Sequence, residues 1–62
     1  MNSYRAVAIC EGFEEPESDQ EVLEGWQHLI DTGLAWSLQG WFGRTAAHLI
    51  DLGVCRYAEE QS

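Results

Sequence analysis

The sequence predicts a small all-α domain of three helices that spans residues 1–62. Two segments carry this prediction, because each repeats its apolar residues at helical spacing and each ends in a glycine suited to a helix stop. The length allows one domain, since domains usually run from roughly 50 to 250 residues. A domain this small buries only about 60% of the surface that the unfolded chain exposes, so we expect a partner or a second copy to contribute to its stability.

The first predicted element is a helix at about residues 3–11 that stops near Gly12. A helical stripe is formed by Ala6, Ile9, Cys10 and Phe13. Residues 3–10 also fit a short strand, so the sequence leaves both forms open. The charged loop that follows contains Pro16, which discourages a continuous helix into the next segment.

The second predicted helix covers about residues 19–32. Ser18 can cap the first backbone N–H groups, and Glu21 stands three residues later, as in a capping box. The apolar stripe that follows consists of Val22, Trp26, Leu29, Ile30 and Gly33.

The third predicted helix covers residues 41–52, and its stripe is Phe42, Thr45, Ala46, Leu49, Ile50 and Gly53. The sequences around Gly33 and Gly53 are alike, with an apolar residue after each glycine and a leucine five positions before that residue, as in Schellman ends. We therefore expect a helical hairpin of the last two helices, capped by Gly33 and Gly53. The connector from Leu34 to Gly40 has room for a single helical turn.

The charge of the chain limits the partners that it can have. Its 3 basic and 11 acidic residues give a net charge of −8. Direct binding to nucleic acid is not expected, because affinity for phosphates comes mostly from Lys and Arg. An anionic membrane surface is disfavoured for the same reason. A basic protein surface would instead attract this chain, mainly at low salt.

The longest unbroken apolar run, from Ala6 to Cys10, is far shorter than the roughly 20 residues that span a bilayer. No basic segment of a signal peptide precedes it. We expect a cytoplasmic protein without a membrane association. In that compartment Cys10 and Cys55 should stay reduced.

From Glu21 onward the chain resembles a family of short uncharacterised proteins encoded by tailed bacteriophages. The resemblance rests on QHLIDTGLAWSLQG at residues 27–40 and on GRTAA at residues 43–47, and it covers roughly the last two-thirds of the chain. It implies a phage-encoded accessory protein that acts in the cytoplasm of the infected host cell. It implies no catalytic residues. The bulky pair Trp41-Phe42 departs from the family pattern.

No pattern in the sequence is typical of an enzyme or of a metal or cofactor site. Cys10, His28, His48 and Cys55 are zinc-binding types, but they lack the close pairs that structural zinc sites use. The sequence has no nucleophile elbow and no P-loop. A helix-turn-helix is also disfavoured, because the last helix carries Arg44 as its only cation. We expect no catalytic residue, no metal and no cofactor.

The first candidate contact surface is the acidic segment, residues 11–24. It holds 7 of the 11 acids, namely Glu11, Glu14, Glu15, Glu17, Asp19, Glu21 and Glu24. One interpretation is a solvated loop with favourable negative charge at a helix start. The other is an anionic surface that mimics a nucleic-acid backbone and occupies a basic groove of a host protein. The loop acids Glu14, Glu15 and Glu17 are the predicted partner-binding residues.

The second candidate is the aromatic face of the last helix, formed by Trp41, Arg44, His48 and Leu52. It lies about 120° from the core stripe. Trp and Arg are enriched at interface hot spots, although the same face could pack inside the domain. The functional hypothesis is a non-catalytic phage protein that binds and inhibits a host protein. The alternative is a structural protein in which this face closes a homodimer.

Overall fold

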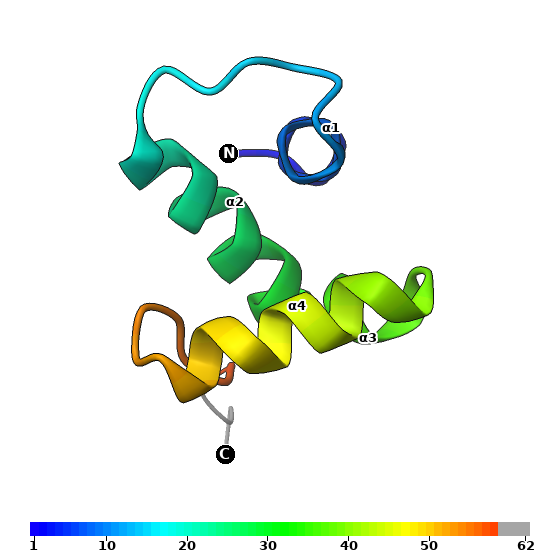
Figure 1. Ribbon diagram of the computed structural model, residues 1–62. Coiled ribbons are helices and arrows are strands. Elements are labelled where there is room, and N and C mark those ends of the chain that lie inside the picture. Colours follow the sequence, from blue (N-terminus) through cyan, green and yellow to red (C-terminus); the bar gives the residue numbers. More distant parts are fainter. Residues whose placement is uncertain (59–62) are drawn as a thin grey trace.

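The computed structural model describes residues 1–58 and folds them into four helices (Figure 1). They are α1 (Ser3–Glu11), α2 (Asp19–Asp31), α3 (Leu34–Ser37) and α4 (Gly40–Asp51). Within the described residues the structure has no strand, so the all-α prediction is confirmed. Residues 3–11, for which the sequence left a strand open, are helical.

Local hydrogen bonds at both ends explain why α1 is a helix. The Asn2 side chain caps its start by accepting the Arg5 backbone N–H at 2.8 Å. At its end Gly12 takes a left-handed conformation with φ of 85°, and the Phe13 backbone N–H then donates to the Ala8 carbonyl at 2.9 Å. Helix α1 therefore stops where the glycine predicts.

Helix α2 begins at the predicted cap, where Ser18 Oγ accepts the Glu21 backbone N–H at 3.2 Å. The return bond of the capping box is shifted by one residue. Glu21 Oε1 accepts the backbone N–H of Glu17 at 2.8 Å, because the same carboxylate also binds Arg5 on α1. Thus a contact between helices adjusts a local motif.

The glycine stops at the ends of α2 and α4 are confirmed, each with φ of 82°. After Gly53 the chain forms both Schellman bonds, from the Gly53 N–H to the Ile50 carbonyl at 3.0 Å and from the Val54 N–H to the Leu49 carbonyl at 3.1 Å. Gly33 forms the first of these bonds, to the Ile30 carbonyl at 3.1 Å, and Leu34 then begins α3 at once. The connector is thus a helical turn, which raises the number of helices from the expected three to four.

Because α3 stands between α2 and α4, these two helices do not form the predicted hairpin. The helix pairs with closely approaching backbones are α1 with α2, α2 with α3, and α3 with α4. In Figure 1 helix α4 crosses the carboxyl end of α2 obliquely instead of running alongside it. Large side chains join these two helices, since the Trp26 ring lies 5.8 Å from the Phe42 ring and 6.2 Å from the Trp41 ring.

A single core lies between the helices. Leu29, Ala6 and Ala46 are fully buried, and Trp26 is only 6% exposed. The other core members are Ile30, Ala35, Phe42 and Cys55. Alanines at the centre let the helix backbones approach closely, while the rings of α2 and α4 fill the wider part. Among residues 1–58, none of the helices combines the length and the apolar character that a bilayer crossing requires.

Candidate partner-binding site

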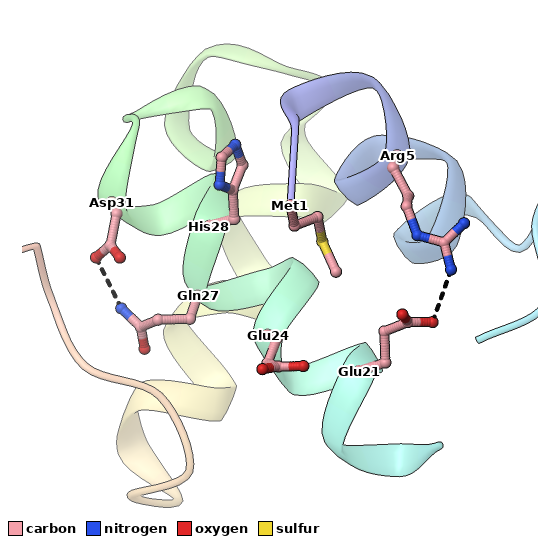
Figure 2. A pocket seen from close by; sticks show the side chains of 7 residues that line it. All are labelled: Met1, Arg5, Glu21, Glu24, Gln27, His28 and Asp31. Carbon is pink, nitrogen blue, oxygen red and sulfur yellow. Dashed lines mark hydrogen bonds and ion pairs between the residues drawn. The ribbon is translucent and has the colours of Figure 1, made fainter. Parts of the chain in front are cut away.

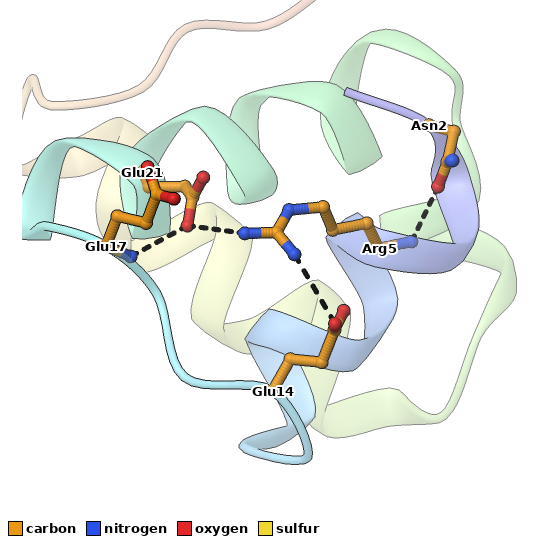
Figure 3. A network of polar contacts seen from close by, with 5 residues as sticks. All are labelled: Asn2, Arg5, Glu14, Glu17 and Glu21. Carbon is orange, nitrogen blue, oxygen red and sulfur yellow. Dashed lines mark hydrogen bonds and ion pairs between the residues drawn. The ribbon is translucent and has the colours of Figure 1, made fainter.

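Arg5 ties α1 to α2 and to the loop between them (Figure 3). Its Nη2 atom lies 3.0 Å from Glu21 Oε1, and its Nη1 atom lies 3.4 Å from Glu14 Oε1. The hydrogen bond and the charge of Glu21 raise the pKa of Arg5. The Glu17 backbone N–H and then Arg5 stabilise the carboxylate of Glu21 and lower its pKa below the ordinary 4.5. The cluster fixes how α1 sits on α2.

This cluster divides the acidic segment. Glu14 and Glu21 are half-buried and face Arg5, so they serve the fold. The five other acids of the segment are exposed: Glu11, Glu15, Glu17, Asp19 and Glu24. Of the three loop acids predicted to bind a partner, Glu15 and Glu17 have exposed side chains, whereas Glu14 is engaged inside the molecule.

The lowered pKa of Glu21 predicts how stability changes with pH. Because the folded-state pKa lies below the unfolded value near 4.5, the contribution is complete above pH 4.5 and is lost as the pH falls through the folded pKa. We therefore expect Glu21→Gln to be less stable than the native chain near pH 7, with a gap that closes in acid. Urea unfolding of both proteins across this pH range measures the gap. A gap that stays constant down to about pH 3 would contradict this assignment.

A polar groove of about 460 Å³ runs between the N-terminal residues and α2 (Figure 2). Figure 2 shows Arg5 bonded to Glu21 at one end and Gln27 bonded to Asp31 at the other. Gln27 also clips the C-terminal segment, since its amide donates to the Arg56 carbonyl at 2.8 Å and its carbonyl accepts the Arg56 N–H at 2.9 Å. Most polar groups of this groove thus serve the fold. Of its two exposed carboxylates, Asp31 accepts the hydrogen bond from Gln27, and Glu24 is the one that can meet a cation.

The aromatic face is only partly exposed to solvent. Arg44, His48 and Leu52 are exposed, with Leu52 at 62%. Trp41 is half-buried, because its ring stacks on Phe42 at 3.9 Å and meets the ring of Trp26 edge-on. Its Nε1 atom donates to Gln39 Oε1 at 3.0 Å. Trp41 therefore combines a packing role against α2 with an exposed edge.

The structure does not gather Cys10, His28, His48 and Cys55 into one site. Burial raises the pKa of Cys10 to about 12, and the nearby Cys55 adds to this shift. Burial also raises the pKa of the Cys55 thiol, so both groups are protonated and poorly reactive at neutral pH. His28 forms a hydrogen bond of 3.0 Å with Ser3 Oγ, and His48 is exposed on α4. Within residues 1–58, no group of three or more His, Cys, Asp or Glu side chains is placed to hold a metal ion.

The prediction that Phe13 belongs to the apolar stripe of the first helix is wrong. The stripe groups Phe13 with Ala6, Ile9 and Cys10, but its side chain is 81% exposed. The left-handed turn at Gly12 takes Phe13 out of the helical register and turns it outward. There it lines the same groove as Tyr4, which is 83% exposed and which the sequence pattern does not mark.

One comparison with known proteins found a match. A family model described as a domain of unknown function (DUF7417) matches residues 6–61. The comparisons with curated proteins and with solved structures found no match. The matched span includes all of α2, α3 and α4 and most of α1. The chain therefore belongs to the DUF7417 family.

Proposed function

We propose that this chain is a non-catalytic accessory protein of a tailed bacteriophage that binds a host protein in the host cytoplasm and inhibits it. The observation that carries the proposal is the outward display of five acids of the acidic segment, while the neighbouring cation Arg5 is held by two other acids. Such a surface attracts a basic partner and repels nucleic acids.

A nucleic-acid-handling protein is the class of host partner that best matches this charge. Its basic groove normally accepts a phosphate backbone, and a row of carboxylates offers a similar charge pattern. The exposed acids lie in three consecutive parts of the chain, namely the end of α1, the loop and the first half of α2. Occupation of the groove by this chain would displace the nucleic acid, which gives inhibition without any catalytic residue.

The aromatic face supplies specificity in this proposal. Arg44, His48 and Leu52 are accessible from solvent, and the exposed edge of Trp41 extends the same face. Arg and Trp side chains dominate interface energies because they bury a large area and also offer directional donors. The acidic segment speeds the encounter, and this face then discriminates between basic partners.

Charge reversal at Glu15 tests the electrostatic part. We expect Glu15→Lys to slow association with the partner several-fold at low salt, because exposed charges steer encounter, and the effect should shrink at high salt. The matched control is Asp31→Lys, which makes the same charge change at the carboxyl end of α2, outside the acidic segment, and should have a smaller effect. Because Asp31 accepts a hydrogen bond from Gln27, circular dichroism checks that this control keeps its fold. The partner is first captured from host extract by the tagged native chain and identified by mass spectrometry. Stopped-flow kinetics with the purified partner then measure the rates.

Equal rates for both variants would show that net charge, and not the acidic segment, controls association. Rates insensitive to both changes and to salt would remove the electrostatic part of the proposal. A homodimer that binds no host protein would support the structural alternative instead. The mass of the purified chain in solution, measured by light scattering, identifies that outcome. Displacement of labelled DNA or RNA from the partner tests inhibition directly.

A further inference from the structure

A groove lies along the outer side of α1. This α1 groove has a volume of about 410 Å³ and is lined by Tyr4, Val7, Ala8, Glu11 and Phe13, together with Ser3. Tyr4, Val7 and Glu11 follow one another at helical spacing, so they form a row along one face. The opposite face of α1 is buried in the domain through Ala6 and Ile9.

The backbone holds the groove open. After Gly12 the backbone N–H groups of Phe13 and Glu14 both donate to the Ala8 carbonyl, at 2.9 and 3.2 Å. These bonds fix Phe13 beside the end of the helix. The groove therefore has an aromatic side chain near each end, with the smaller Val7 and Ala8 between them. A backbone that is already fixed loses little conformational entropy when a ligand binds.

Two large aromatic side chains that are more than four-fifths exposed are unusual in a small soluble domain. Tyr and Phe contribute a large contact area at low entropic cost, and aromatic residues are enriched where proteins meet. The domain leaves both of them uncovered, although it buries Trp26 and Phe42 in its core. The α1 groove thus has the composition of a docking surface.

The charge around the groove selects the occupant. Glu11 lines the groove, and the exposed Glu15 stands two positions after Phe13. Arg5, the cation of the same helix, is already paired with Glu14 and Glu21. The rim is therefore negative. A second copy of this chain would bring the same acids against each other, and an anionic membrane would also be repelled.

We propose that the α1 groove binds a basic amphipathic segment of the partner protein. In this inference, which rests on the proposed function, one large apolar side chain of the segment inserts between Tyr4 and Phe13 over Ala8. A neighbouring Lys or Arg pairs with Glu11. The groove thereby adds a specific anchor to the attraction that the exposed acids provide.

A synthetic peptide probes this inference with the full chain. The peptide is a helix of about four turns with Leu and one Phe on one face and Lys on the other, and a matched peptide carries Glu in place of Lys. Backbone amide shifts in NMR spectra locate the binding site. We expect the Lys peptide to shift the amides of Tyr4, Val7, Ala8, Glu11 and Phe13, and the Glu peptide to leave them unchanged.

Paired variants separate groove binding from general attraction. Tyr4→Ser should weaken binding of the Lys peptide by about tenfold or more, whereas Tyr57→Ser should leave it unchanged. Both tyrosines are exposed, at 83% and 67%, so neither change should unfold the domain, and circular dichroism confirms this. Phe13→Ser repeats the test at the other end of the groove.

Equal binding of the Lys and Glu peptides would overturn the inference. So would an equal loss of Lys-peptide binding in Tyr4→Ser and Tyr57→Ser. Broadening of the α1 amide signals as the protein concentration rises would also overturn it, because it would indicate that a second copy occupies the groove. Peptide shifts confined to Arg44, His48 and Leu52 would remove the groove but leave the proposed function intact. If the peptide binds the groove but the chain captures no host protein, the groove inference stands and the proposed function is removed.

Discussion

Replacing Trp26 with alanine is expected to lower the free energy of unfolding by about 3–5 kcal/mol, which removes most or all of the stability of a domain of this size. The indole is 6% exposed and lies in the core between α2 and α4. It contacts Phe42 at 5.8 Å and Trp41 at 6.2 Å between ring centroids. Its loss leaves a cavity in the core, and the surrounding side chains relax only partly to fill such a space.

Trp36→Ala is the matched control for this prediction. It removes the same indole, but Trp36 is 46% exposed and stacks on Tyr57 at 6.2 Å near the surface. We expect a loss of about 1 kcal/mol, typical of an exposed aromatic pair. Urea unfolding followed by circular dichroism measures both variants. Similar losses would show that Trp26 does not organise the core.

The second large effect is expected for Trp41→Ala, which should weaken binding to the partner by about 2 kcal/mol or more. The exposed edge of the indole belongs to the aromatic face, beside Arg44 and His48. The indole ring also stacks on Phe42, with 3.9 Å between the ring centroids, so the free chain should also lose some stability, though less than in Trp26→Ala. Calorimetric titration of the folded variant with the partner gives the affinity.

Thermal melts of the free variants and a conservative change separate the two roles of Trp41. Trp41→Phe keeps a ring for the stack on Phe42 but loses the hydrogen bond from Nε1 to Gln39. Compared with Trp41→Ala, Trp41→Phe should regain most of the stability of the free chain and only part of the affinity for the partner. If Trp41→Ala melts as low as Trp26→Ala and the folded fraction binds normally, Trp41 belongs to the core alone. The aromatic face would then consist of Arg44, His48 and Leu52.

The sequence by itself determined the helices and their ends. The starts and stops depend on bonds between residues a few positions apart, such as Ser18 with Glu21 and Gly53 with Ile50. Such bonds depend little on what packs against the helix, although the return bond of the α2 capping box shifts by one residue to Glu17 where Glu21 also binds Arg5. The length of the connector after Gly33 likewise allowed a helical turn, which the structure contains as α3.

Only the tertiary structure decided which side chains are available for binding. Phe13 faces solvent because the turn at Gly12 breaks the helical register that the stripe assumed. Glu14 and Glu21 are withdrawn from the acidic segment by Arg5, which meets Glu21 across 16 positions of the chain. Trp41 is half-buried because its ring contacts the ring of Trp26 on α2 and stacks on Phe42. Helical periodicity predicts which residues share a face, but what covers that face depends on how distant helices cross, and this is a property of the packed core.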